Sequence, residues 1–231
     1  MTTRLPYHSV VFDLDGTLLH TWPGLLAAVD NSGLLPSGSF DRTALMRALS
    51  VGIDAMFLEA IRQADLKAEA TPAALAGLRR DYEGCWLDQA QPYADAGALL
   101  DALVREGWQL GVCTNRDSRT TKALLQRLGW SGHFAAVTCI DQIDHPKPDA
   151  RHLLAVIEAL DSEPGTCLYV GDSALDARCA AAAQVDFVSH AAGYHLQPQD
   201  LQPHLFSFSH HSELLRWLEV ETPSALESSH G

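Results

Sequence analysis

The stretch Val10-Val11-Phe12-Asp13-Leu14-Asp15-Gly16-Thr17-Leu18 joins a short hydrophobic run to two carboxylates, a glycine and a hydroxyl. The β-branched and aromatic side chains of residues 10–12, followed by Gly16, predict a buried strand that ends in a tight turn. Charged groups beside an apolar strand cost free energy unless they are paired, hydrogen-bonded or bound to a metal, so Asp13 and Asp15 indicate a site. Taken alone, an Asp-x-Asp-Gly turn also fits a solvated loop or a calcium loop.

Composition and charge limit the classes of protein that this chain can be. Its 231 residues, 47% of them hydrophobic, can bury a sizeable core in one large or two modest domains. The formal net charge of -13 argues against a nucleic acid or an anionic membrane as the main partner, because both attract clustered Lys and Arg. Residues 1–8 are too short and polar for a signal peptide, and no apolar run approaches the roughly 20 residues of a membrane span.

The cysteines point to a reducing compartment. There are five, an odd number, and they form no Cys-x-x-Cys pair that would indicate a zinc or redox site. Cys113, Cys139 and Cys167 each stand in a short apolar run, where a free cysteine packs as a small hydrophobe. We therefore expect free thiols and a cytoplasmic protein.

The order of predicted elements divides the chain. Residues 19–91 show helical periodicity, strongest over 22–29, 44–49, 55–61 and 72–86, and no convincing strand. Strands and helices then alternate: strands are predicted at 108–113, 136–140, 166–170 and 185–189, and helices at 95–106, 118–128, 147–160 and 175–183. We predict a core formed by residues 1–18 and 92–220, an inserted all-helical domain at 19–91, and a disordered tail at 221–231.

Strands separated by crossover helices predict a doubly wound α/β fold, with a parallel sheet covered by helices on both faces. In such folds ligands bind at the carboxyl ends of the strands. The polar residues expected at those ends, together with a lysine at a helix start, are Asp13, Asp15, Thr114, Asn115, Asp172, Asp176 and Lys147.

Four motifs in order along the chain resemble those of the haloacid dehalogenase-like hydrolases. They are Asp13-x-Asp15-Gly16-Thr17, Thr114-Asn115, Lys147-Pro148 and Gly171-Asp172-Ser173-x-x-Asp176. The resemblance covers about residues 7–195, and it implies a Rossmann-like core. The helical insert is similar to the small cap of the subgroup that contains phosphoglycolate phosphatases and β-phosphoglucomutases, and Gly193-Tyr194 is similar to a phosphoglycolate phosphatase pattern.

The chemistry of these residues suits the cleavage of a phosphate monoester, which needs a nucleophile, an acid for the leaving oxygen, and positive charge around the phosphoryl group. Asp13 suits the nucleophile and would form an aspartyl-phosphate, while Asp15 would protonate the leaving alcohol and then activate water. Lys147 would neutralise phosphoryl oxygens. Hydrogen bonds to the phosphoryl group are expected from Thr114 and from the N–H groups of Asn115 and Gly16.

A phosphate dianion is repelled by these carboxylates, so a hard divalent cation with oxygen ligands is expected, and the predicted ion is Mg²⁺. The resemblance implies that Asp13, the backbone carbonyl of Asp15, and Asp172 would hold it. Asp176, four residues after Asp172, is expected to support the site by orienting Lys147 or a metal-bound water.

The predicted function is Mg²⁺-dependent hydrolysis of a small phosphorylated metabolite, because a small cap suits a small substrate. Two alternatives stay open: a phosphotransferase similar to β-phosphoglucomutase, and a non-catalytic binding protein on the same fold. Phosphoglycolate phosphatases commonly carry Asp-Ser where this chain has His20-Thr21, which concerns substrate choice. His20, Trp22 and Arg47 are candidates to face the site from the cap, hinges are expected near 18–20 and 90–92, and His210-His211 is expected at a solvated helix start.

Overall fold

The central sheet of the computed structural model, which describes residues 7–49 and 52–221, has six parallel strands. They are β1 (Ser9–Phe12), β4 (Gln109–Thr114), β5 (Ala136–Cys139), β6 (Cys167–Gly171), β7 (Asp186–His190) and β8 (Phe206–Phe208). Their order is β5-β4-β1-β6-β7-β8, so the strand that precedes the two aspartates lies inside the sheet. In register, Val10 lies opposite both Leu110 of β4 and Leu168 of β6. The predicted doubly wound α/β fold is confirmed.

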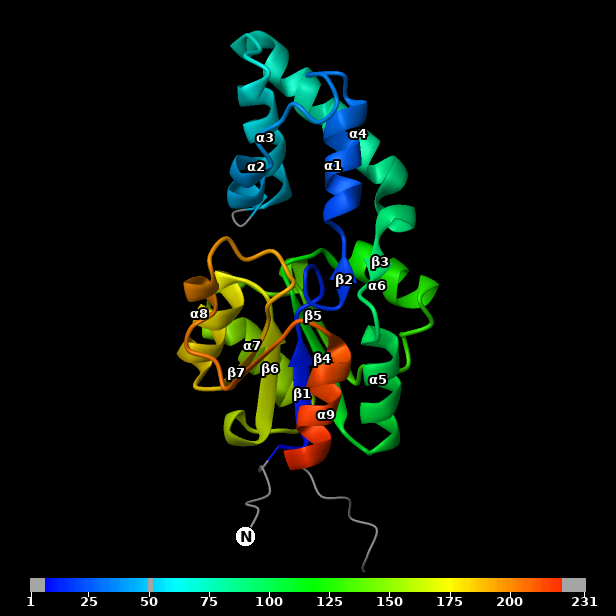
Figure 1. Ribbon diagram of the computed structural model, residues 1–231, viewed down its shortest axis with the longest axis vertical. Coiled ribbons are helices and arrows are strands. Elements are labelled where there is room, and N and C mark those ends of the chain that lie inside the picture. The colour runs from blue at the N-terminus through cyan, green and yellow to red at the C-terminus, as the bar shows by residue number, and fades with distance from the viewer. Residues whose placement is uncertain (1–6, 50–51, 222–231) are drawn as a thin grey trace, which may run out of the picture.

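Alternation along the buried strands assigns helices to the two faces of the sheet (Figure 1). Val10 and Phe12 pack in one apolar cluster with side chains of α5 (Ala96–Arg105), α6 (Ser118–Arg127) and α9 (His211–Glu221). Val11 points to the other face and packs with α7 (Ala150–Ala159) and α8 (Ala174–Ala183). Because both faces are covered, β1 is buried along its whole length.

Among the described residues between positions 21 and 90, four α-helices stand beyond the carboxyl ends of the strands (Figure 1). They are α1 (Trp22–Asn31), α2 (Arg42–Leu49), α3 (Ile53–Gln63) and α4 (Thr71–Gln89). Helix α1 packs on α4, and α2 packs on α3. Their apolar faces continue the cluster of the sheet, since Phe57, Leu78 and Trp86 belong to the same buried group as Phe12. Short 3₁₀ turns lie at η1 (Ala68–Ala70), η2 (Ile140–Gln142), η3 (Pro164–Thr166) and η4 (Pro198–Leu201).

The margins of this helical block are not helical. β2 (Leu19–His20) and β3 (Gln91–Pro92) form an antiparallel pair in which Leu19 lies opposite Pro92. The prediction of no strand within 19–91 is therefore wrong at its edges, because two-residue strands are too short to show an alternating pattern. The chain leaves and re-enters the sheet at one place, where the Tyr93 N–H also donates to the Leu18 carbonyl at 3.0 Å.

Two further expectations are corrected. Strand β8 was not predicted, whereas the helix start expected at His210-His211 is the start of α9, but His211 there is 1% exposed rather than solvated. Its Nε2–H donates to the Thr17 carbonyl at 3.0 Å, because α9 folds back against the turn after β1. Lys147-Pro148 does not open a helix: α7 begins at Ala150, and the Asp149 side chain caps it by accepting from the Arg151 N–H. Residues 222–231, most of the expected tail, lie outside the described residues.

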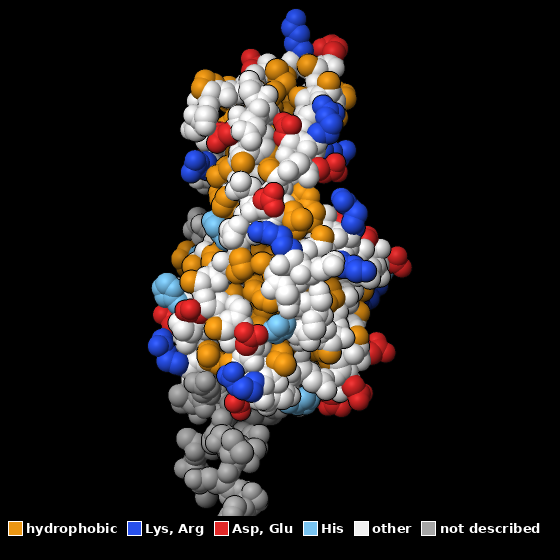
Figure 2. Space-filling view, turned by 90° about the vertical axis from the view of Figure 1, so that its right-hand side faces the viewer, with side chains coloured by type: hydrophobic (Ala, Val, Ile, Leu, Met, Phe, Trp, Pro, Cys, Tyr) orange, Lys and Arg blue, Asp and Glu red, His pale blue; other side chains and the backbone are white. Residues whose placement is uncertain are grey.

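No helix among residues 7–49 and 52–221 is long and apolar enough to cross a membrane. On the face drawn in Figure 2, acidic and basic side chains are intermixed over both the helical block and the sheet domain. The excess of negative charge is thus not gathered in one patch on that face.

Candidate active site

The predicted site residues converge at the carboxyl ends of the central strands. Asp13 follows β1, Thr114 ends β4, and Asp172 follows β6, and all three are buried. They line a cavity of about 210 Å³ between the sheet and the helices α1–α3. The residues that line this cavity are Asp13, Asp15, Thr21, Leu25, Met46, Leu49, Gly52, Ile53, Thr114, Asn115, Arg116, Ile140, Lys147, Asp172, Ser173, Leu175 and Tyr194.

Lys147 connects two of the carboxylates. Its Nζ donates to Asp13 Oδ1 and to Asp176 Oδ1, each at 2.7 Å, although these residues are far apart in sequence. Burial alone would lower the pKa of Lys147, but the charges of Asp13 and Asp176 raise it well above its ordinary value. The lysine therefore carries a fixed positive charge at the floor of the cavity.

Asp176 lies behind the lining of the cavity and is held by several hydrogen bonds. Its Oδ1 also accepts from the Tyr169 hydroxyl at 2.6 Å, and its Oδ2 accepts from the Ser173 N–H at 3.0 Å and from the Ser173 hydroxyl. Burial would raise the pKa of Asp176, but Lys147 and these hydrogen bonds bring it below its ordinary value. An ionised Asp176 fixes the direction in which the Lys147 ammonium points.

Asp172 sits in a space that only glycines leave open. A Cβ on Gly16, whose φ is +91°, would lie 2.1 Å from Asp172 Oδ2, and a Cβ on Gly193 would lie 2.4 Å from the same oxygen. The Thr17 hydroxyl donates to Asp172 Oδ1 at 2.9 Å, and the Tyr194 N–H donates to Oδ2 at 2.6 Å. The turn after β1 and the loop after β7 thus clamp this carboxylate from two sides.

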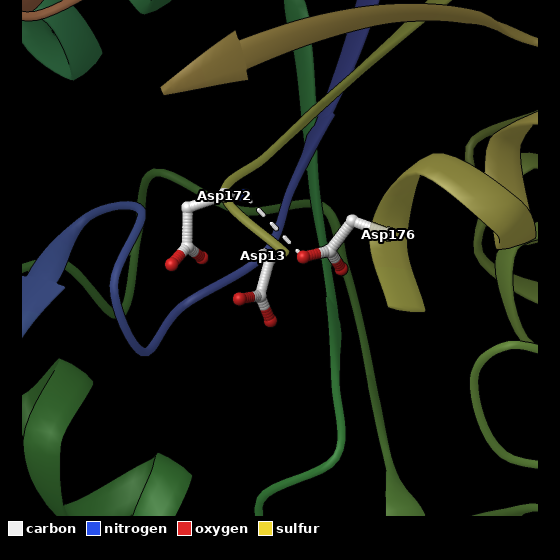
Figure 3. A group of neighbouring side chains, drawn as sticks. All are labelled: Asp13, Asp172 and Asp176. Atoms are coloured by element: carbon white, nitrogen blue, oxygen red, sulfur yellow. Dashed lines mark hydrogen bonds between the residues drawn. The ribbon is translucent and has the colours of Figure 1, made fainter. Parts of the chain in front are cut away.

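Three buried carboxylates, those of Asp13, Asp172 and Asp176, lie close together at the strand ends. Asp13, Asp172 and Asp176 each offer an oxygen, these atoms lie within 4.8 Å of one another, and all three residues are buried (Figure 3). Burial raises the pKa of Asp13 in spite of Lys147, and burial together with the charges of Asp13 and Asp176 raises the pKa of Asp172. One ammonium group does not balance three carboxylates, and oxygen donors suit a hard divalent ion, so the residues fit a metal site.

Asp15 has a different partner from Asp13. Its two carboxylate oxygens accept from Arg116 Nε at 2.9 Å and Nη2 at 2.7 Å, a bidentate pair. Burial would raise the pKa of Asp15, but Arg116 lowers it below its ordinary value. Arg116 Nη2 also donates to the Tyr82 hydroxyl of α4 at 3.2 Å, so the pair joins the sheet domain to the helical block.

Of the remaining predicted residues, Thr114 and Asn115 line the cavity, whereas Gly16 and Asp176 do not. The Asn115 amide donates to the Lys147 carbonyl at 3.1 Å, which anchors the lysine loop. The Gly16 N–H donates to the Leu19 carbonyl at 2.8 Å, so in this conformation it closes its own turn instead of facing the cavity. Asp176 lies behind the lining, next to Ser173.

The candidates His20, Trp22 and Arg47 do not line the cavity. Its lining residues from the helical block are Thr21, Leu25, Met46, Leu49, Gly52 and Ile53. The His20 ring lies against the rings of Tyr93 and Tyr194, and Trp22 lies beside Tyr194. The Tyr194 hydroxyl accepts from the backbone N–H groups of Thr21 at 2.6 Å and Trp22 at 2.8 Å. Tyr194 therefore bonds both the start of α1 and the Asp172 carboxylate.

Sequence reasoning missed the contacts of Thr17, Arg116 and Tyr194. Arg116 had a usable signal, because it directly follows Thr114-Asn115 at the end of a predicted strand and a charged residue there needs a partner. Tyr194 approaches Asp172 only through the loop after β7, and no local pattern encodes that approach.

Comparison with known proteins agrees with this geometry. A family model described as haloacid dehalogenase-like hydrolase matches residues 7–184. The chain is 35% identical over 225 residues to a phosphoglycolate phosphatase of Rhodospirillum rubrum, covering 93% of this chain and 92% of the relative. It is 30% identical over 205 residues to an N-acetylmuramic acid 6-phosphate phosphatase of Pseudomonas aeruginosa, covering 87% of this chain and 88% of the relative.

A solved structure shares the fold. A protein described as a predicted phosphoglycolate phosphatase from Haemophilus somnus aligns with a TM-score of 0.80 at 22% identity, covering 92% of this chain and 98% of that one. The fold, the convergence of the four motifs and the family match agree. The chain therefore belongs to the haloacid dehalogenase-like hydrolases, in their phosphoglycolate phosphatase-like subgroup, and it is a phosphatase of that family.

Proposed function

We propose that this protein is a Mg²⁺-dependent phosphatase that hydrolyses a small phosphate monoester similar to phosphoglycolate through an aspartyl-phosphate. The observation that carries the proposal is the buried group in which Lys147 Nζ bonds Asp13 and Asp176, each at 2.7 Å, beside the Asp172 carboxylate. Among the described residues, no hydrogen bond engages Asp13 Oδ2, and Asp13 lines the cavity.

In the first step, an Asp13 carboxylate oxygen attacks phosphorus and forms a new P–O bond. The bond between phosphorus and the ester oxygen breaks, and Asp15 transfers a proton to that oxygen, so that a neutral alcohol leaves. Lys147 balances charge on the phosphoryl oxygens during this transfer, and Thr114 and Asn115, which line the same cavity, would donate hydrogen bonds to them. Asp13 is then an acyl phosphate and Asp15 is ionised.

In the second step, Asp15 removes a proton from a water molecule as the water oxygen attacks phosphorus. The bond between phosphorus and Asp13 breaks, which releases inorganic phosphate and regenerates the Asp13 carboxylate and the protonated Asp15. The two carboxylates have separate partners, Lys147 and Arg116, and this separation supports separate roles.

The metal would be held by Asp13, Asp172 and the backbone carbonyl of Asp15. When bound, Mg²⁺ supplies positive charge that offsets the repulsion between the phosphate dianion and the carboxylates. Asp176, whose oxygens already accept hydrogen bonds from Lys147, Tyr169 and Ser173, is left to position the lysine.

We also propose that helices α1–α4, within residues 19–91, act as a cap that moves about the β2–β3 pair. Both chain crossings lie at this pair, so rotation there requires changes at few backbone positions. A cap of this size above a cavity of about 210 Å³ suits a small phosphorylated metabolite.

The test is phosphate release from phosphoglycolate, a sugar phosphate and a nucleotide, with Mg²⁺ and with chelator. We expect release from a small ester that chelation stops and added Mg²⁺ restores, and that Asp13→Asn lowers by about 10³-fold or more. Asp88→Asn, an exposed site on α4, is the matched control and should retain activity. Acid-quenched wild-type protein should carry labelled phosphate that Asp13→Asn lacks. Folded wild-type protein that releases phosphate from none of these esters would contradict the proposal, and transfer to a second hydroxyl would identify a mutase.

A further inference from the structure

Gly193 and Tyr194, in the loop after β7, lie against Asp172 but take no part in the reaction steps proposed above. The Tyr194 N–H donates to Asp172 Oδ2 at 2.6 Å. The backbone can come this close because residue 193 has no side chain: a Cβ there would lie 2.3 Å from Asp172 Cβ. Asp172 is one of the proposed metal ligands, so the position of this loop sets the direction of a ligand oxygen.

The side chain of Tyr194 reaches the helical block. Its hydroxyl accepts from the N–H groups of Thr21 at 2.6 Å and Trp22 at 2.8 Å, at the start of α1. The first N–H groups of a helix have no partner within the helix. At this helix the Thr21 side chain makes no capping hydrogen bond, and Pro23 has no N–H to offer. A tyrosine that follows Thr21 by 173 residues thus caps α1.

The loop that carries Tyr194 belongs to the sheet domain. The Ala191 N–H donates to the Phe208 carbonyl of β8 at 2.7 Å. Thr21 and Trp22 directly follow β2, so a rotation of the cap about the β2–β3 pair turns their N–H groups away from a hydroxyl that stays with the sheet. Opening of the cap therefore breaks both bonds to the Tyr194 hydroxyl and frees its side chain.

We propose that Tyr194 is a positioning residue that couples the cap to the metal site. With the cap closed, its hydroxyl holds the start of α1 and its backbone N–H holds Asp172 Oδ2 in one direction. When the cap opens, the freed side chain no longer steadies the loop, and Asp172 is held less firmly. The inference rests on the proposed function, from which it takes the metal ligand and the moving cap, and it adds the residue that connects them. Because such coupling is reciprocal, bound Mg²⁺ should favour the closed cap by the same factor by which the closed cap favours Mg²⁺.

Tyr194→Phe tests the coupling, because it removes the hydroxyl and keeps both the ring and the backbone N–H. The measurement is amide hydrogen exchange at Thr21 and Trp22, without substrate, in the absence of metal and with saturating Mg²⁺. In wild-type protein, Mg²⁺ should slow this exchange by about 5-fold or more. In Tyr194→Phe, exchange without metal should be about 10-fold faster than in wild type, and Mg²⁺ should change it by less than about 2-fold. The calorimetric Kd for Mg²⁺ should rise by about 5-fold.

Gly193→Ala disturbs the other end of the same connection. The added methyl group meets Asp172, so the loop or the carboxylate must shift, and the Kd for Mg²⁺ should rise by about 5-fold or more. Coupling further requires that exchange at Thr21 and Trp22 becomes faster in this variant, although the substitution lies outside the cap. Urea unfolding shows whether both variants remain folded.

Tyr7→Phe is the matched control for the loss of a tyrosine hydroxyl. Tyr7 bonds Asp186 where β7 begins, at the amino ends of the strands and away from the cavity. Its substitution should leave the exchange at the start of α1 and the Kd for Mg²⁺ within about 2-fold of wild type.

Two results would overturn the inference in protein that binds Mg²⁺ and releases phosphate. Wild-type exchange at Thr21 and Trp22 in Tyr194→Phe would show that the hydroxyl does not hold α1. Faster exchange in that variant, with an unchanged Kd for Mg²⁺, would show that the cap and the metal site are independent. Wild-type protein that binds no Mg²⁺ would instead overturn the metal dependence in the proposed function, and the coupling with it.

Discussion

The floor and the wall of the cavity differ in how they hold their side chains. On the floor, charged residues are buried and each makes several short hydrogen bonds, as Asp176 does with Lys147, Tyr169 and Ser173. The wall on α1–α3 presents Leu25, Met46, Leu49 and Ile53. Under the proposed function, the phosphoryl group common to all substrates would meet the fixed polar residues of the floor, and the variable part of the substrate would meet the apolar side chains of the wall.

The largest effect is expected from removing Asp176, which accepts hydrogen bonds from the residues at the floor of the cavity. Asp176→Ala removes an acceptor shared by Lys147, Tyr169 and Ser173, so the buried Tyr169 hydroxyl loses its partner and Lys147 Nζ keeps only its bond to Asp13. We expect the free energy of unfolding to fall by about 2–4 kcal/mol and kcat to fall by about 100-fold. Urea unfolding and phosphate release measure the two effects. Asp176→Asn, which keeps the shape and one acceptor oxygen, should lose less stability; equal losses in both variants would show that volume, not hydrogen bonding, matters here.

The second effect is a pH dependence of stability that arises from His211, the buried residue that donates to the Thr17 carbonyl in the turn after β1. Burial lowers the pKa of His211 to about 3, whereas the unfolded chain binds a proton there near pH 6.5. Because the folded pKa is the lower one, the stability due to the neutral ring is complete above about pH 6.5 and is lost progressively as the pH falls toward 3. At pH 5 this loss is about 2 kcal/mol.

His211→Gln should therefore be less stable than wild type at pH 7.5, and should lose about 2 kcal/mol less between pH 7.5 and pH 5. Urea unfolding at the two pH values provides the measurement. His210→Gln changes the exposed neighbour and should follow the wild-type pH dependence. If His211→Gln followed it as well, the buried ring would not be the source of acid sensitivity.

The smallest effect tests the wall. Met46→Ala removes a half-buried side chain from the cavity without touching a charged group. We expect KM for a small ester to rise by about 2- to 10-fold with kcat within about 2-fold of wild type. Steady-state kinetics, with Leu58→Ala as an exposed control on α3, would show this. A fall of kcat comparable to that of Asp176→Ala would contradict the division between floor and wall.

The same division explains what the sequence could predict. Asp13, Thr114 and Asp172 follow strands that local patterns reveal, and strand ends of a parallel sheet meet at one edge, so both the fold and most of the floor could be predicted. The contact between Tyr194 and Asp172 depends on how the loop after β7 returns, and the burial of His211 depends on how α9 packs. Helical periodicity located α1–α4, but it did not indicate which of their side chains face the cavity.

The two-residue pairing of β2 with β3 has a consequence for how the chain reaches this fold. Val10 must pair with Leu110 across the whole inserted block, and closing so long a loop costs entropy and slows folding. When α1–α4 pack on one another and Leu19 meets Pro92, the two ends of the block are held side by side. The effective separation between β1 and β4 then becomes short. A pair of strands too small for any sequence pattern to reveal thus turns a distant encounter into a nearly local one.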